Sequence, residues 1–167
     1  FFPEPDDLAV IRKLDFQHPA TWLATWGGLG FLKPAPGTWG SVGAIPFGLI
    51  LYALGGTFGV LLLIALVIYG GLWACRIFEE QTGTHDSKMI VIDEVAGQLI
   101  AMLPAAMSPL LVILSFLLFR GFDILKPGPI GMIDRRWPGA KGVMADDILA
   151  GAFAAVIVLG LRYAGFD

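Results

Sequence analysis

Charged residues are scarce in this sequence. They make up 15% of the 167 residues, against 56% hydrophobic residues, whereas soluble domains carry about 25% charged residues. The mean hydropathy is +0.75, and the apolar residues come in blocks long enough to matter in a bilayer. This composition excludes an ordinary soluble domain and predicts an integral membrane protein.

Cysteine and histidine are nearly absent. The single Cys75 lies in an apolar run, so a disulfide framework is excluded, and with only His18 and His85 the chain lacks the ligands that zinc prefers. The net charge of -3 is too small to indicate nucleic-acid binding. Any metal chemistry must therefore use oxygen ligands.

Five apolar blocks follow one another, separated by short polar or Gly/Pro-rich joints. The blocks are Val42–Leu54, Phe58–Phe78, Val95–Leu103, Leu110–Phe119 and Ile148–Leu161. The third block would reach only about 15 Å as a helix, so some helices are expected to be short or broken and packed inside the bundle. The sequence predicts an all-α polytopic bundle of about four or five membrane helices, forming one domain over residues 1–167.

Small residues recur at helix-contact spacing. They are Gly40, Ala44 and Gly48 in one block, and Gly151 and Ala155 in another. Small side chains allow the backbones of membrane helices to approach closely. These positions are therefore predicted to be packing contacts.

The N-terminal part differs from the blocks that follow. Residues 1–17 form a variable segment without an informative pattern. Leu8–Trp26 mixes apolar and charged positions, with Trp22 and Trp26 on one helical face. This pattern predicts an interfacial helix anchored by aromatic rings.

The distribution of basic residues indicates an orientation. Five alternating passes put the joint at Gly55-Gly56, the joint Pro104–Pro109 and the C-terminus on one side of the membrane. Ten of the eleven Lys and Arg residues fall on the opposite side, and only Arg162 falls on the first. The positive-inside rule then makes the polar face cytoplasmic.

Carboxylates gather on that polar face. Asp93-Glu94 and Asp146-Asp147 each open an apolar block, and Asp123 lies near the end of another. Capping and the helix dipole explain one acid at a helix start, but two adjacent acids at two starts resemble a hard oxygen-ligand set. Such a set suits Mg²⁺.

Basic and hydroxyl side chains accompany these acids. Arg120, Asp123 and Lys126 lie at i, i+3 and i+6, which offers two cations to an anion, although internal salt bridging explains the spacing equally well. The loop 34–41 precedes a helix, and its backbone N–H groups, Thr38 and Ser41 can bind phosphate there. The loop lacks the Gly-Lys-Ser/Thr ending of a Walker A motif, so it is a weak signal by itself.

Five runs of residues occur in the order and approximate spacing of one known family. They are PGTWGS at 36–41, HD at 85–86 with IVIDE at 90–94, FRGFDILKPGPI at 119–130, DR at 134–135 and GVMADD at 142–147. Through these runs, from about His18 to Ala155, the chain resembles the phosphatidylglycerophosphatase A family.

The resemblance implies a Mg²⁺-dependent phosphatase of the bacterial inner membrane, with its active site on the cytoplasmic face. Its substrate would be the phospholipid phosphatidylglycerophosphate, converted to phosphatidylglycerol and inorganic phosphate. The metal ligands would be Asp93, Glu94, Asp146 and Asp147, with Asp86 or Asp123 as a further ligand or base. The phosphate would be bound by Lys33, Thr38, Ser41, Arg120, Lys126 and Arg135. His85 would either donate a proton to the leaving group or serve as a structural hydrogen-bond partner beside Asp86. The oligomeric state is left open.

Two other functions are weighed against this one. A small transporter or cation channel needs polar groups inside the membrane, but apart from Arg76 the blocks contain no charged residue, and Gln98 alone is strongly polar. A Mg²⁺-dependent lipid-headgroup transferase would use similar carboxylates. Release of a nucleotide monophosphate would distinguish a transferase from a hydrolase.

Overall fold

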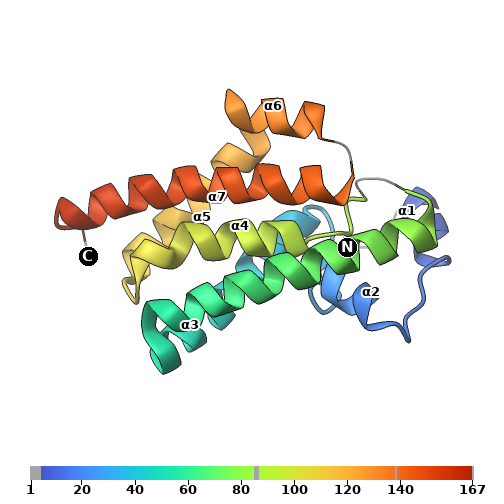
Figure 1. Cartoon of the computed structure of the whole chain (residues 1–167), viewed down its shortest axis with the longest axis horizontal. Coiled ribbons are helices and arrows are strands. Elements are labelled where there is room, and N and C mark those ends of the chain that lie inside the picture. Colours follow the sequence, from blue (N-terminus) through green and yellow to red (C-terminus); the bar gives the residue numbers. More distant parts are fainter. Residues whose placement is uncertain (1–4, 85–86, 138, 167) are drawn as a thin grey trace.

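The computed structural model describes residues 5–84, 87–137 and 139–166, apart from the side chains of Pro5 and Asp134. Within these ranges the secondary structure is helical, with no strand. Figure 1 shows the long helices running side by side along the longest axis, with the short helix α6 outside them. The predicted all-α class is confirmed.

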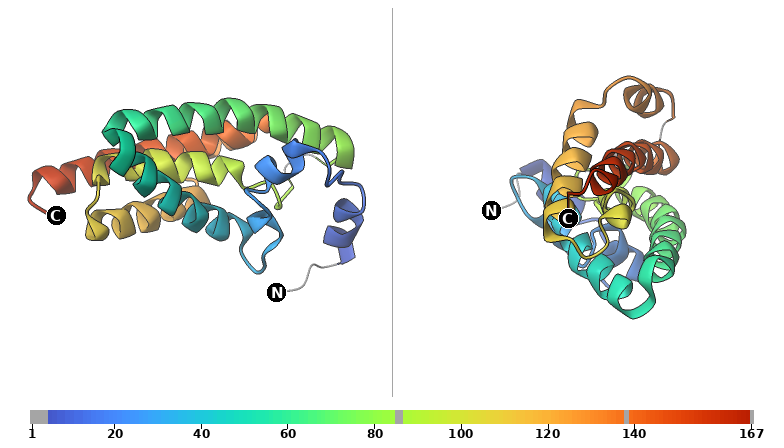
Figure 2. Two further views of the ribbon diagram at one scale, coloured as in Figure 1. Left: turned by 90° about the horizontal axis from the view of Figure 1, so that it is seen from below. Right: turned by 90° about the vertical axis from the view of Figure 1, so that its left-hand side faces the viewer.

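The longest element, α3 (Pro36–Thr82), is a hairpin of two arms. Gly56 has φ 57° and ψ -150°, which no α-helix contains, and the chain reverses there (Figures 1 and 2). The arms approach closely beyond the turn, because a Cβ on Gly59 would lie 2.4 Å from the carbonyl oxygen of Leu51. The arms contain the first two apolar blocks, so the predicted joint between them is confirmed.

The short third block forms the central helix α4 (Ile92–Met102), which η2 (Leu103–Ala105) continues. Its 11 residues extend about 17 Å. The helix packs against α3, α5 and α7, and nine of its residues are buried. The expectation of a short helix packed inside the bundle is confirmed.

The last three helices are α5 (Pro109–Leu125), α6 (Pro129–Arg136) and α7 (Ala140–Tyr163). Ser108 begins α5, because its Oγ accepts a hydrogen bond from the Leu111 N–H at 3.3 Å. Lys126 ends α5 in the left-handed region, with φ 45°. Since Pro127 follows directly, the chain leaves the helix there and turns into α6.

The joints between helices lie at the two ends of the bundle. The turn of α3, η2 and the end of α7 lie at one end, on the left of Figure 1. There the Arg162 guanidinium donates a hydrogen bond to the Pro104 carbonyl at 3.0 Å. The starts of α4 and α7 lie toward the other end. This is the arrangement that alternating passes predict.

The N-terminal region forms short helices. They are α1 (Pro5–Ile11), α2 (Pro19–Ala24) and η1 (Leu29–Phe31). The prediction of one interfacial helix over Leu8–Trp26 is wrong, because His18 starts a separate helix by accepting a hydrogen bond at Nδ1 from the Ala20 N–H. Trp26 lies beyond the end of α2, with φ 47°, so it does not share a helical face with Trp22.

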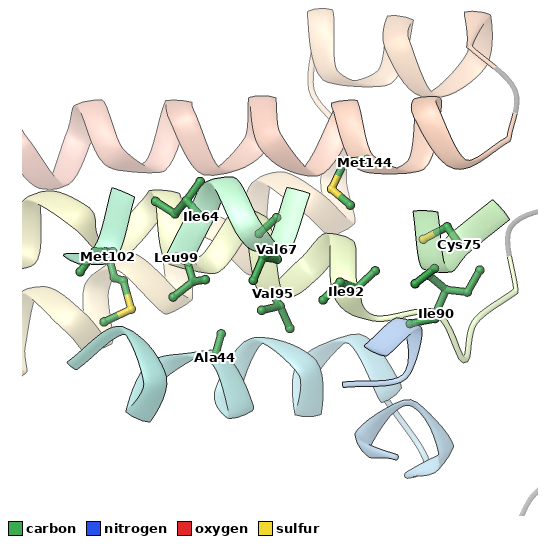
Figure 3. Packing of buried hydrophobic residues seen from close by; sticks show 14 of the residues in the cluster. Ala44, Ile64, Val67, Cys75, Ile90, Ile92, Val95, Leu99, Met102 and Met144 are labelled. Atoms are coloured by element: carbon green, nitrogen blue, oxygen red, sulfur yellow. The ribbon is translucent and has the colours of Figure 1, made fainter. Parts of the chain in front are cut away.

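The core lies between α3, α4 and α7. Figure 3 shows Ile92, Val95 and Leu99 of α4 between the two arms of α3, with Ala44 on the first arm and Ile64 and Val67 on the second. The outer faces are apolar as well, with large exposed side chains on α3, α5 and α7. Among the described helices, α3 and α7 are long and apolar enough to cross a bilayer.

The small-residue contacts predicted at Gly40, Ala44, Gly48 and Gly151 are confirmed, whereas Ala155 is only partly buried and its contact stays a prediction. The closest of these contacts joins α4 to α7. A Cβ on Gly151 would lie 2.4 Å from the Gly97 carbonyl oxygen, and one on Gly97 would lie 2.7 Å from the Asp147 carbonyl oxygen. Only glycine allows backbones this near. On the first arm of α3, Gly40 packs against Val91.

Replacement of Gly151 by alanine should separate α4 from α7, since the new methyl group meets backbone rather than a movable side chain. We expect Gly151→Ala to lower the free energy of unfolding by about 1–3 kcal/mol, measured by thermal unfolding in detergent. Gly160→Ala is the matched control, because Gly160 lies on the same helix with open space around it. This control should be neutral or slightly stabilising, and equal losses in both variants would contradict the prediction.

Candidate active site

Three carboxylates converge at the start of α4 and the N-terminal third of α7. Asp93 and Glu94 lie in the first turn of α4, and Asp147 is the eighth residue of α7, about two turns from its start. Each offers an oxygen atom within 4.8 Å of an oxygen of the others. The backbone contact of Gly97 with Gly151 brings the two helix starts this close. We call Asp93, Glu94 and Asp147 the acidic triad.

The triad is largely removed from water. Asp93 and Asp147 are 5% and 3% exposed, and the Glu94 side chain is 17% exposed. Asp93 Oδ1 and Glu94 Oε2 are buried atoms with no hydrogen-bond partner among the described residues. Buried oxygens of this kind require a partner, and a cation supplies one.

Burial and mutual repulsion oppose ionisation at the start of α4. Burial, followed by the charge of Glu94, raises the pKa of Asp93 well above its usual range. Burial, followed by the charge of Asp147, raises the pKa of Glu94 to about 8. Both groups precede the apolar run Val95–Leu103. The same carboxylates would ionise readily beside a divalent cation.

The start of α3 closes one side of the site. A Cβ on Gly37 would lie 1.9 Å from Glu94 Oε1 and 3.3 Å from Arg120 Nη1. The Glu94 carboxylate therefore lies against the first turn of α3, near the positive end of the helix dipole. Any larger residue at Gly37 would displace it.

Arg120 lies at the edge of the triad. Its Nη1 is 2.5 Å from Asp123 Oδ2, on the same helix, and 3.9 Å from Glu94 Oε1. The salt bridge that the i, i+3 spacing allowed is thus present. The same guanidinium remains next to the triad, where it can also meet an anion.

Lys126 has a different partner from the one its spacing suggested. Because it lies in the left-handed region after α5, it leaves the helical face of Arg120, and its Nζ bonds to Asp146 Oδ2. Asp146 is 2% exposed. The adjacent acids of α7 therefore diverge: Asp147 joins the triad, and Asp146 binds a lysine.

The triad fits a hard divalent cation. All its donor atoms are carboxylate oxygens, which Mg²⁺ prefers. Two of these oxygens are buried without a hydrogen-bond partner among the described residues. Three protein ligands also leave positions for water and substrate. The residues present therefore fit the ion that the sequence predicts.

Two of the predicted phosphate ligands bond to groups outside the triad. Lys33 Nζ is 2.7 Å from Asp7 Oδ2 of α1, and the Ser41 Oγ–H donates to the Gly37 carbonyl at 2.9 Å. Thr38 is half-buried in the first turn of α3, and Arg135 is exposed on α6. His85 and Asp86 lie outside the described residues. The roles assigned to these residues stay predictions.

Two glycines shape the site without having been predicted to do so. Gly37 makes room for the Glu94 carboxylate, and Gly97 makes room for α7. Gly37 belongs to the PGTWGS run, which was predicted to bind phosphate and not to contact a carboxylate side chain. Gly97 lies three residues after Glu94, and this i, i+3 spacing indicates that both residues lie on one face of the helix.

Magnesium should stabilise the parent protein, because it relieves repulsion within the triad. We expect saturating Mg²⁺, at about one hundred times its Kd, to raise the Tm by about 5–10 °C over the chelated protein in detergent. Asp147→Asn should reduce this shift to less than about 2 °C and make the chelated protein more stable than the chelated parent. Asp6→Asn, at an exposed carboxylate of α1, should retain the full shift. A full shift in Asp147→Asn would contradict the prediction.

Known proteins resemble this chain over most of its length. The family model described as phosphatidylglycerophosphatase A matches residues 22–162. Phosphatidylglycerophosphatase A of Haemophilus influenzae is 37% identical over 155 residues, covering 92% of this chain and 94% of the relative. The protein of the same name from Escherichia coli is 35% identical, covering 93% and 90%.

A relative from Bacteroides thetaiotaomicron, provisionally named phosphatidylinositol-3-phosphatase, is 34% identical and covers 84% of this chain and 92% of its own length. No solved structure matches the chain. The family model and the first two relatives each match most of the chain, and this extent of similarity establishes the family. The chain belongs to the phosphatidylglycerophosphatase A family.

Proposed function

We propose that this protein hydrolyses the terminal phosphate of phosphatidylglycerophosphate with a Mg²⁺ ion held by the acidic triad. The products are phosphatidylglycerol and inorganic phosphate. The observation that carries this proposal is the buried set of three carboxylates, with unpartnered oxygens, in a chain of this family. A phosphatase of phosphomonoesters needs such a site for a cation and, beside it, positive groups for the phosphate.

Asp93, Glu94 and Asp147 would hold Mg²⁺. The bound ion supplies Lewis-acid activation of the phosphate and of a water molecule. Arg120, whose Nη1 lies 3.9 Å from Glu94 Oε1, binds the phosphate oxygens at the edge of the triad. The guanidinium is held in place by Asp123, so it opposes the charge that develops on the phosphoryl group without reorganising.

Proton transfer completes the reaction. Water attacks phosphorus, the bond from phosphorus to the glycerol oxygen breaks, and the glycerol oxygen takes up a proton. Asp123 or Asp86 accepts the proton of the attacking water, and His85 protonates the leaving oxygen. Lys126 holds Asp146 beside the triad, which keeps the start of α7 in position.

We also propose that the bundle spans the bacterial inner membrane several times, with the triad at the cytoplasmic face. Large apolar side chains are exposed along α3, α5 and α7, for example Leu54 (80%), Ile113 (57%) and Val156 (70%). Such surfaces suit contact with lipid. The 24 residues of α7 extend about 36 Å, enough for a bilayer core of about 30 Å.

Transport and headgroup transfer are the rival functions. Gln98, the strongly polar residue inside the apolar blocks, is fully buried and donates a hydrogen bond from Nε2 to Ser115 Oγ at 3.2 Å. This pair fits a packing contact between α4 and α5 better than an ion path. A transferase would release a nucleotide monophosphate from an activated lipid and an acceptor alcohol, whereas the phosphatase needs only water.

Phosphate release from phosphatidylglycerophosphate should require both Mg²⁺ and Glu94. In detergent micelles, we expect a chelator to abolish release and Glu94→Gln to lower kcat by at least about a hundredfold, since the amide is a poorer metal ligand. Phosphate release from phosphatidylinositol 3-phosphate, measured in parallel, tests which lipid headgroup the enzyme prefers.

The matched control for this assay is Glu80→Gln, at an exposed glutamate of α3, which should leave the rate unchanged. Release that persists in folded Glu94→Gln would exclude the proposed metal site. A folded parent that releases no phosphate from this lipid would exclude the proposed reaction.

The orientation predicts opposite accessibility for the two ends of the bundle. In intact bacterial cells, a membrane-impermeant maleimide should label Gly55→Cys, at the exposed turn of α3. It should label Lys141→Cys, at the exposed start of α7, only after permeabilisation. The native Cys75 is 1% exposed and should not react. Labelling of Lys141→Cys in intact cells would contradict the proposed orientation and place the start of α7 outside the cytoplasm.

A further inference from the structure

An apolar hollow lies between the end of α5, the start of α6 and the middle of α7. It has a volume of about 170 Å³ and is lined by Phe122, Pro127, Gly128, Pro129, Ile130 and Phe153. The rings of Phe122 and Phe153 are in contact, with centroids 6.0 Å apart. No charged or hydroxyl side chain lines the hollow, so its surroundings favour a hydrocarbon ligand.

The chain connects the lining of this hollow directly to polar groups of the site. Phe122 precedes Asp123, and Pro127 follows Lys126. On α7, Phe153 follows Asp146 by seven residues, which puts both on one face of the helix, about two turns apart. The hollow therefore begins next to the Lys126–Asp146 pair and continues along α7.

The hollow runs from the polar end of the bundle toward the apolar part that would face the hydrocarbon of a membrane. From Asp146 to Phe153, α7 passes from the polar end of the bundle into the apolar block Ile148–Leu161. Phe153 is 41% exposed there, and Ile124 and Leu125 at the end of α5 are 68% and 78% exposed. A lipid with its phosphate at the triad would extend its hydrocarbon in this direction.

We infer that this hollow binds the glycerol-proximal part of one acyl chain of the lipid whose phosphate lies at the acidic triad. The inference rests on the proposed function, because that function places a phosphate beside Arg120 at the edge of the triad. An amphipathic ligand needs cations at one end and an apolar surface at the other, and the two are contiguous here. Burial of methylene groups then favours lipid over water-soluble phosphate esters.

The first test fills the hollow. Phe153→Trp should raise the KM for phosphatidylglycerophosphate in mixed micelles by about tenfold with kcat unchanged, since it removes binding that is equal in ground and transition states. Val156→Trp is the matched control, because Val156 lies on the same helix, is 70% exposed and does not line the hollow. The Mg²⁺-induced shift in Tm should be the same in both variants and in the parent, which shows that the fold and the triad are intact.

The second test needs no catalysis. Phosphatidylglycerol that carries a diazirine near the glycerol end of one acyl chain should cross-link to residues 122–130 and to Phe153 in the parent, and lose these cross-links in Phe153→Trp. Equal KM values in both tryptophan variants, or cross-links spread evenly over the exposed faces of α3 and α7, would overturn the inference. Cross-links at the hollow without phosphate release from the parent would refute the phosphatase and leave the acyl-chain site standing.

Discussion

The contact between the α4 and α7 backbones is the constraint on which the proposed site depends. At Gly97 and Gly151 no side chain separates the two helices, and a single Cβ would meet a carbonyl oxygen. Because carboxylates repel one another, nothing about Asp93, Glu94 and Asp147 draws them together. Helix packing brings them together instead, and leaves oxygens that need a cation.

Two basic residues adjust the charge around this contact. Arg120 neutralises Asp123, and Lys126 binds Asp146, so the two cations are matched with acids next to the triad. Among the described side chains next to the triad, five carboxylates still exceed these two cations. A divalent cation would balance the excess and provide the positive charge that attracts a phosphate.

Beyond the polar end that holds the triad, the surface of the bundle is apolar. A water-soluble phosphatase buries its apolar residues, whereas here large apolar side chains cover the outside of α3, α5 and α7. This surface suits an enzyme whose substrate is itself part of the membrane. Under the proposed function, phosphate and acyl chain are bound at adjacent places, one at the helix starts and one between α5 and α7.

The sequence by itself determined the class of the fold and the order of its main helices. Apolar block lengths and the glycine pair at 55–56 predicted the helices and the reversal in α3, because these features depend on local hydropathy and backbone freedom. The N-terminal helix was predicted wrongly, since local periodicity does not reveal that His18 starts a new helix. Family motifs identified the acids that matter as a group.

Only the tertiary structure decided how those acids are divided. Asp146 and Asp147 are neighbours in the chain, yet they point to different partners because adjacent helical residues lie about 100° apart. Asp147 faces α4, where Gly97 allows close approach, and Asp146 faces Lys126. Which oxygens meet in space depends on helix rotation and packing distance, and neither is encoded in the spacing of residues along the chain.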